Sequence, residues 1–114
     1  MKVGIIRCMR REGACYGTGD FKAIADKTGA FEGVEENIDL IGYANCGGCP
    51  GTQIPVIAKN LVEKGADTIA FSTCMSHDIP IKPACPGFEH NKNAVIQAVG
   101  PDVKILDFTH NLKK

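Results

Sequence analysis

The sequence has no long apolar run, no excess of either charge and no obvious export segment. Its longest apolar runs are the length of a strand, so none predicts a helix that spans a bilayer. The 13 Lys and Arg residues balance the 13 Asp and Glu residues. Nucleic acids and anionic membranes require a basic surface, so we expect neither as a partner. The apolar part of the N-terminus is too short for a secretory signal, which predicts a cytoplasmic protein.

The chain length of 114 residues predicts a single domain spanning residues 1–114. A hydrophobic fraction of 44% is enough to build a core without crosslinks. In a reducing compartment, cysteines of such a domain are available as metal ligands or redox groups, although one or two can simply be buried as small apolar residues. The chain has six of them: Cys8, Cys15, Cys46, Cys49, Cys74 and Cys85.

Strand-like and helix-like segments alternate along the chain. Runs rich in Ile, Val and Phe without strict alternation are typical of strands covered on both faces. They predict strands at 3–6, 38–43, 68–71 and 103–108. The order β-α-β-α-β-α-β predicts an α/β fold with an open parallel sheet of about four strands and helices on both faces. We expect the flavodoxin-like strand order 2-1-3-4.

Helix boundaries follow from capping residues and glycines. Asp20 is expected to cap a first helix that stops at Gly29, and Thr52 a second helix that ends at Gly65. A third helix carries an apolar stripe of Phe88, Val95, Ile96 and Val99, begins near Pro86 and ends at Gly100-Pro101.

The positions of the cysteines relative to the strands carry the functional argument. Cys8 follows the first predicted strand, Cys46 and Cys49 follow the second, and Cys74 follows the third. Parallel strands all end at one edge of the sheet, which is the usual ligand site of such folds. The sequence therefore predicts a metal site formed by Cys8, Cys46, Cys49 and Cys74. Alternates are Cys85, which precedes the third helix, His110, which follows the fourth strand, and Cys15 in the loop after Cys8.

The central motif is Cys46-Gly47-Gly48-Cys49-Pro50-Gly51. Two thiolates at this spacing can coordinate one metal ion, or the two cysteines can form one disulfide. Pro50 suits the first turn of a helix, which would set Cys49 at the helix N-terminus, where the dipole favours a thiolate. Cys85-Pro86-Gly87 repeats the pattern, and Cys85 is either a similar thiolate or an incidental turn residue.

Several of these segments together resemble the CGGC-domain family, over nearly the whole chain. They are Ile6-Arg7-Cys8, Cys15 with residues 17–21, the central motif, Cys74, Cys85-Pro86 and Thr109-His110. The resemblance implies a small metal-binding α/β protein and no established reaction. In that family His often follows Cys-Pro, whereas this chain has Gly87.

These observations favour a zinc ion bound by thiolates, with iron or an iron–sulfur cluster as the alternative. A second hypothesis is a thiol–disulfide oxidoreductase or redox sensor, in which Cys46 attacks and Cys49 resolves. A phosphate or flavin binder is disfavoured because cysteines occupy the loops where phosphate would lie. The sequence leaves open whether the protein is an enzyme, which protein partner it has, and whether it forms a homodimer.

Overall fold

The computed structural model describes residues 1–11, 16–77 and 84–111. Its strands are β1 (Lys2–Arg7), β2 (Asp39–Asn45), β3 (Thr68–Phe71) and β4 (Lys104–Leu106), and all neighbouring strands pair in parallel. The sheet order is β2-β1-β3-β4, which confirms the α/β class and the flavodoxin-like order expected from the sequence. The strands at the two edges of the sheet, β2 and β4, each begin one residue later than predicted. β2 ends two residues later than predicted and β4 two residues earlier.

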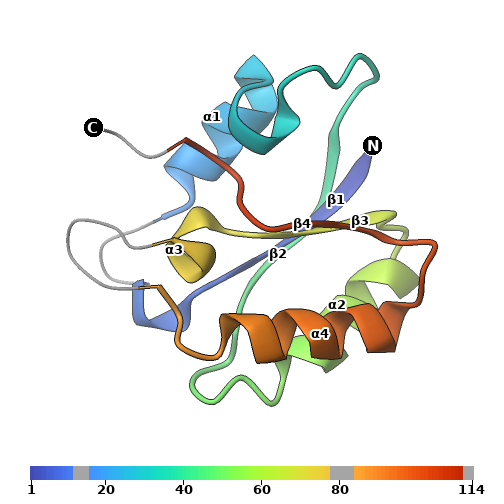
Figure 1. Ribbon diagram of the computed structural model, residues 1–114. Helices are drawn as coiled ribbons and strands as arrows, with labels where there is room; N and C mark the ends of the chain where they lie inside the picture. Colours follow the sequence, from blue (N-terminus) through green and yellow to red (C-terminus); the bar gives the residue numbers. More distant parts are fainter. Residues whose placement is uncertain (12–15, 78–83, 112–114) are drawn as a thin grey trace.

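Helices cover both faces of the sheet (Figure 1). One face carries α1 (Thr18–Asp26) with the short 3-10 helix η2 (Gly29–Phe31), and the other carries α2 (Ile54–Glu63) and α4 (Phe88–Val99). A short helix, α3 (Thr73–Ser76), follows β3, and the 3-10 helix η1 (Met9–Arg11) follows β1. No helix within the described ranges is long and apolar enough to traverse a bilayer.

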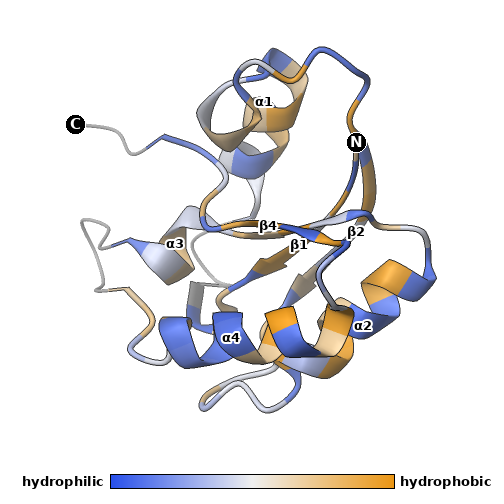
Figure 2. Ribbon diagram, turned by 45° about the vertical axis from the view of Figure 1, so that its right-hand side comes forward, coloured by the Kyte–Doolittle hydropathy of each residue, from blue (hydrophilic) through white to orange (hydrophobic). Residues whose placement is uncertain are grey.

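Two buried clusters lie on opposite faces of the sheet because successive side chains of a strand point to opposite sides. Val3 and Ile5 of β1 pack with Ala23 of α1 and Phe31, whereas Ile6 packs with α2 and α4. Figure 2 shows apolar residues along the strands, and an α4 whose first half is hydrophilic and whose second half is hydrophobic.

Helix α2 lies very close to the sheet. A side chain at Gly4 would place its Cβ 2.8 Å from Cδ1 of Leu61, and one at Gly42 would collide with the same leucine. Leu61 therefore fills the space that Gly4 of β1 and Gly42 of β2 leave open, because glycine has no side chain. This close approach fixes α2 over β1 and β2, and with it the loop that carries the CGGC motif.

Three local expectations are wrong. Helix α1 begins before Asp20, its N-cap is Gly17, and the left-handed residue Lys27 ends it before Gly29. Helix α2 is preceded by Gln53 rather than by a Thr52 cap. Helix α2 begins at Ile54, so Cys49 and Pro50 lie in the turn before it and not at its N-terminus. The helix-dipole argument for a Cys49 thiolate therefore does not hold.

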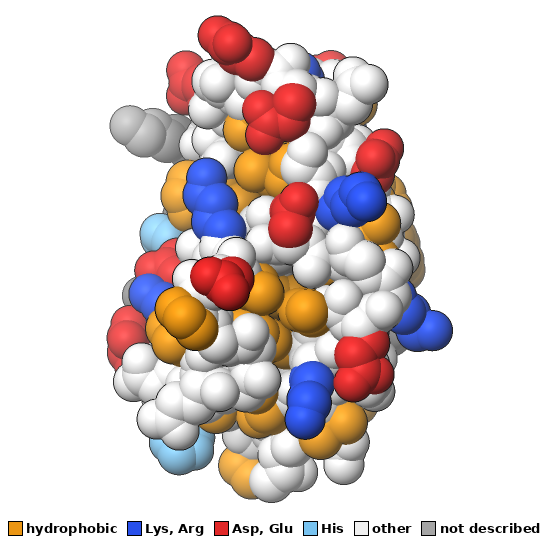
Figure 3. Space-filling view, turned by 90° about the vertical axis from the view of Figure 1, so that its right-hand side faces the viewer, with side chains coloured by type: hydrophobic (Ala, Val, Ile, Leu, Met, Phe, Trp, Pro, Cys, Tyr) orange, Lys and Arg blue, Asp and Glu red, His pale blue; other side chains and the backbone are white. Residues whose placement is uncertain are grey.

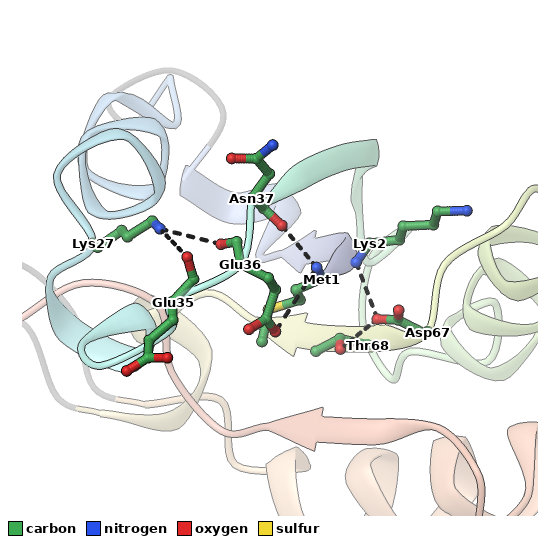
Figure 4. Close-up of polar contacts among 8 residues, drawn as sticks. All are labelled: Met1, Lys2, Lys27, Glu35, Glu36, Asn37, Asp67 and Thr68. Atoms are coloured by element: carbon green, nitrogen blue, oxygen red, sulfur yellow. Dashed lines mark hydrogen bonds and ion pairs between the residues drawn. The ribbon is translucent and has the colours of Figure 1, made fainter.

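The N-terminal ends of the strands form the opposite end of the molecule from the five described cysteines. There the Met1 ammonium donates to the Asn37 carbonyl oxygen at 2.7 Å, and the Asp67 carboxylate accepts from the Lys2 N–H at 3.1 Å (Figure 4). Figure 3 shows acidic and basic side chains interspersed on this face, in keeping with the balanced charge of the chain. These contacts fix the start of β1.

Candidate functional site

The candidate site is a cavity of about 220 Å³ at the C-terminal edge of the sheet, on the face covered by α2 and α4. Cys8, Cys46, Cys49 and Cys85 all border it. Cys8 directly follows β1 and Cys46 directly follows β2. The chain segments that supply these thiols are far apart in sequence, and the parallel sheet brings them to one edge.

The CGGC loop forms one wall of the cavity. The Cys46 N–H donates to the Arg7 carbonyl oxygen at 2.7 Å, which extends the pairing of β1 and β2 by one residue. The Met9 N–H in turn donates to Sγ of Cys46 at 3.4 Å. Cys46 thus makes one hydrogen bond to the backbone through its N–H and one through its sulfur.

The segment before α4 forms the facing wall. The Cys85 N–H donates to the Met75 carbonyl oxygen at 2.9 Å, and the Cys85 carbonyl accepts from the Phe88 N–H at 3.1 Å. Helix α4 has Gly87 as its N-cap and begins two residues after the Pro86 expected to start it. Cys85 therefore precedes the helix cap and faces the cavity from a turn.

A buried asparagine joins the two walls. Asn91 of α4 is 3% exposed, borders the cavity, and donates from Nδ2 to the Pro50 carbonyl oxygen at 3.4 Å. Gly51 has a φ of 92°, and a Cβ there would lie 2.8 Å from Nδ2 of Asn91. Glycine at this position therefore lets the CGGC loop approach α4 closely.

Exposure differs among the four thiols. Cys8 and Cys46 are each 6% exposed, Cys85 is half-buried and Cys49 is exposed. The described residues that line the cavity include no Asp, Glu, His, Lys or Arg. None of the five described cysteines is in a disulfide. The cavity thus offers reduced sulfur in an apolar setting, reached from solvent at Cys49.

Two other expected ligands, Cys74 and His110, are not among the described residues that line this cavity. Cys74 lies in α3, is 6% exposed and packs in the same buried cluster as Cys8 and Cys46, but it is not among the described residues that line the cavity. The His110 ring lies against Gly19 at the start of α1, where a Cβ would be 2.9 Å from Cδ2 of the imidazole. Cys15 falls outside the described residues.

The side chains at the cavity suit a metal ion in their chemistry but not in their grouping. Thiols in an apolar setting suit a thiophilic ion. Yet within residues 1–11, 16–77 and 84–111, no three His, Cys, Asp or Glu side chains are grouped so that they could hold an ion. The residues therefore match a soft metal in chemistry and do not present the closed set of ligands that a structural zinc site requires.

A network of polar side chains lies at the same edge of the sheet, on the face that α1 covers. Asp20, which is 2% exposed, accepts hydrogen bonds from the Tyr43 hydroxyl at 2.9 Å and the Ser72 hydroxyl at 2.6 Å, and a short one from the Thr109 hydroxyl. Thr73 extends the network, since its hydroxyl donates to the His110 carbonyl oxygen at 2.7 Å. Asp20 thus ties α1 to the ends of β2, β3 and β4.

This role of Asp20 was not predicted from the sequence, nor were the positions of Met75 and Asn91 at the cavity. The spacing Gly17-Thr18-Gly19-Asp20 looks like a helix start, and Asp at such a place is usually a cap. The signal available was the set of hydroxyl residues that follow the third and fourth strands, Ser72, Thr73 and Thr109. Buried hydroxyls need acceptors, and a carboxylate is a strong one.

Comparison with known proteins identifies the family. The CGGC domain matches residues 2–110, so the chain belongs to the CGGC-domain family. The chain is 33% identical over 120 aligned positions to the uncharacterized protein MJ0582 of Methanocaldococcus jannaschii, covering 100% of this chain and 90% of that protein. No solved structure matches the chain. The family is compatible with metal binding, and the match identifies neither a metal nor a reaction.

Proposed function

We propose that this CGGC-domain protein binds a thiophilic metal ion through the thiols that border the cavity. The observation that carries the proposal is the convergence of Cys8, Cys46, Cys49 and Cys85 on one cavity, from three separate stretches of chain. Cysteines needed only for packing would have no reason to gather around one opening. Cys85 takes the place that the sequence analysis gave to Cys74.

The fold explains why the ion would be bound rather than required for folding. Phe71 and Phe88 pack edge to face at 5.3 Å between their centroids, inside an apolar core built from the sheet, α2 and α4. Structural zinc sites, by contrast, supply the folding free energy of small domains that lack such a core. The proposed ion is therefore one that the folded protein takes up and releases.

Binding would release protons. Each thiol that becomes a ligand must lose its proton, so uptake is expected to weaken as the pH falls. The exposed Cys49 is the first thiol that an incoming ion meets, and the buried Cys8 and Cys46 lie further in. Ligation by three or more thiols requires side-chain rotation, because no such group is preformed among the described residues.

Elemental analysis of protein purified without oxygen, followed by titration with zinc and with ferrous iron, tests the proposal. We expect uptake that is lost in Cys46→Ser and Cys8→Ser. Cys74→Ala is the matched control, because this cysteine is as buried as Cys8 and Cys46 and does not line the cavity. Loss of binding in Cys74→Ala would return Cys74 to the ligand set. Binding that persists in both Cys8→Ser and Cys46→Ser would refute the cavity as the site.

A second candidate function is thiol–disulfide exchange by Cys46 and Cys49. The observation that favours it is that this motif combines an exposed thiol, Cys49, with a buried one, Cys46. This pairing reverses the roles expected from the sequence, since the accessible Cys49 would attack and Cys46 would resolve. The substrate disulfide would be reduced to two thiols as the pair becomes a disulfide, and an external dithiol would reduce the pair again.

An insulin-reduction assay with dithiothreitol as the electron donor distinguishes the two functions. Activity that is lost in Cys49→Ser, in protein without metal, would establish thiol exchange. The all-parallel sheet argues against it, because the thioredoxin sheet is mixed. We therefore place metal binding first.

A further inference from the structure

The cavity is bordered by a methionine as well as by the four cysteines. Met75 of α3 is 1% exposed and borders the cavity, and its carbonyl oxygen accepts the N–H of Cys85. Methionine sulfur is a soft, uncharged donor. Zinc in proteins is held by thiolates, imidazoles and carboxylates, whereas cuprous copper is also selected by thioethers.

The charge balance of the cavity points in the same direction. A zinc ion held by four thiolates keeps two uncompensated negative charges. A monovalent ion held by two thiolates and a thioether keeps one. The described lining contains no cationic side chain to offset either charge, and Cys8 and Cys46 are nearly buried. Because burying uncompensated charge is costly, the low-charge complex is favoured.

Ligand number adds a third argument. Zinc sites almost always have four ligands, and at least three of them come from the protein. No three His, Cys, Asp or Glu side chains within the described ranges are grouped to provide them. Cuprous copper accepts about two or three sulfur ligands, so it does not need such a group.

Building on the proposed metal binding, we propose that the cavity selects cuprous copper over zinc, and that Met75 is a ligand together with cysteine thiolates. Each ligating thiol gives up a proton to solvent, the thioether gives up none, and copper stays in the cuprous state throughout. No oxidant or reductant is needed. The site is thus a copper(I) site with mixed thiolate and thioether donors.

Competition under anaerobic conditions tests the inference. The reduced full-length chain is titrated with copper(I) acetonitrile complex against bathocuproine disulfonate, and with zinc against a chromophoric zinc chelator. We expect copper(I) to displace any bound zinc. Met75→Leu, which keeps the volume and removes the sulfur, should weaken copper(I) binding by about tenfold and leave zinc binding unchanged.

Ile54→Leu is the matched control, because Ile54 borders the cavity, is 1% exposed and carries no donor atom. It should leave copper(I) affinity unchanged. Selenomethionine-labelled protein provides a test that needs no substitution and is unaffected if Met75→Leu fails to fold. Copper X-ray absorption should then show a copper–selenium distance, and this signal should persist in Met9→Leu.

The outcomes separate the two proposals. Zinc binding that copper(I) does not displace, or absence of copper–selenium scattering in the labelled protein, overturns the inference and leaves metal binding in place. Equal weakening of both metals by Met75→Leu also overturns it, because that result describes packing rather than ligation. Binding of neither metal to the reduced protein overturns metal binding itself.

Discussion

Removal of the Asp20 carboxylate is expected to destabilise the fold strongly. The change Asp20→Ala leaves the hydroxyls of Ser72 and Thr109 without their acceptor, and these residues are 3% and 0% exposed. The third donor, Tyr43, is half-buried, so its hydroxyl can turn to water at little cost.

The magnitude follows from the two buried donors. A buried polar group left without a partner costs about 1–3 kcal/mol, and hydrogen bonds to a charged group are at the upper end. Two such groups give about 4 kcal/mol, after some relief because the carboxylate no longer has to be desolvated. For a chain of this length, 4 kcal/mol corresponds to a fall in Tm of about 15 °C.

Urea unfolding followed by circular dichroism measures the effect, with an unchanged m-value as the sign that both states keep their compactness. Asp26→Ala is the matched control, because Asp26 lies in the same helix and is exposed. It should change stability by less than about 0.5 kcal/mol. Asp20→Asn retains one acceptor oxygen and should cost about half as much as Asp20→Ala.

A double-mutant cycle shows whether the network is the cause. Thr109→Val should be costly alone and much less costly in the Asp20→Ala background, because the partner is then already gone. If Asp20→Ala is no more destabilising than Asp26→Ala, or if the two changes at positions 20 and 109 are additive, the reasoning from this network is refuted.

Three further outcomes are expected. Gly51→Ala combines a positive φ with a Cβ 2.8 Å from Asn91 Nδ2, so it should lower the free energy of unfolding in urea by about 1–3 kcal/mol. Gly33→Ala is the control, because the added Cβ there meets nothing within 4 Å. A smaller effect at Gly51 than at Gly33 would contradict the close approach. Phe71→Ala should cost about 3–5 kcal/mol, because its fully buried ring packs edge to face on Phe88, and a stability near that of the parent chain would be incompatible with this core. Burial raises the pKa of Asp67, but hydrogen bonds from Thr68 and the Lys2 N–H and the positive charges of the N-terminus and Lys2 outweigh it and lower the pKa below its ordinary value. The contribution of ionised Asp67 to the free energy of unfolding is therefore present above the unfolded pKa of about 3.9 and is lost as the pH falls through the lowered folded pKa. Because the side chain is exposed, this contribution is less than about 1 kcal/mol. The stability gap between the parent chain and Asp67→Asn, measured by urea unfolding from pH 7 to pH 2, should close on acidification, and a gap that widens would contradict this sign.

The order of elements and the edge at which the cysteines lie could be predicted from the sequence. Apolar runs at the four strands alternate with helical stripes, and parallel connections then leave few topologies. Cys8 and Cys46 directly follow strands, so their position at one edge needs no knowledge of side-chain packing. The sequence motifs also predicted membership of the CGGC-domain family, which the match over residues 2–110 confirms.

Which side chains face the cavity was decided only by the tertiary structure. Cys74 enters a short helix that sends it into the core, while its neighbour Met75 borders the cavity, because adjacent residues of a helix point in different directions. Asp20 looks like a cap in sequence and is buried because α1 lies across the ends of three strands whose hydroxyls require an acceptor. Residue order fixes which strand a loop follows, but the face that a loop residue presents depends on packing between segments far apart in the chain.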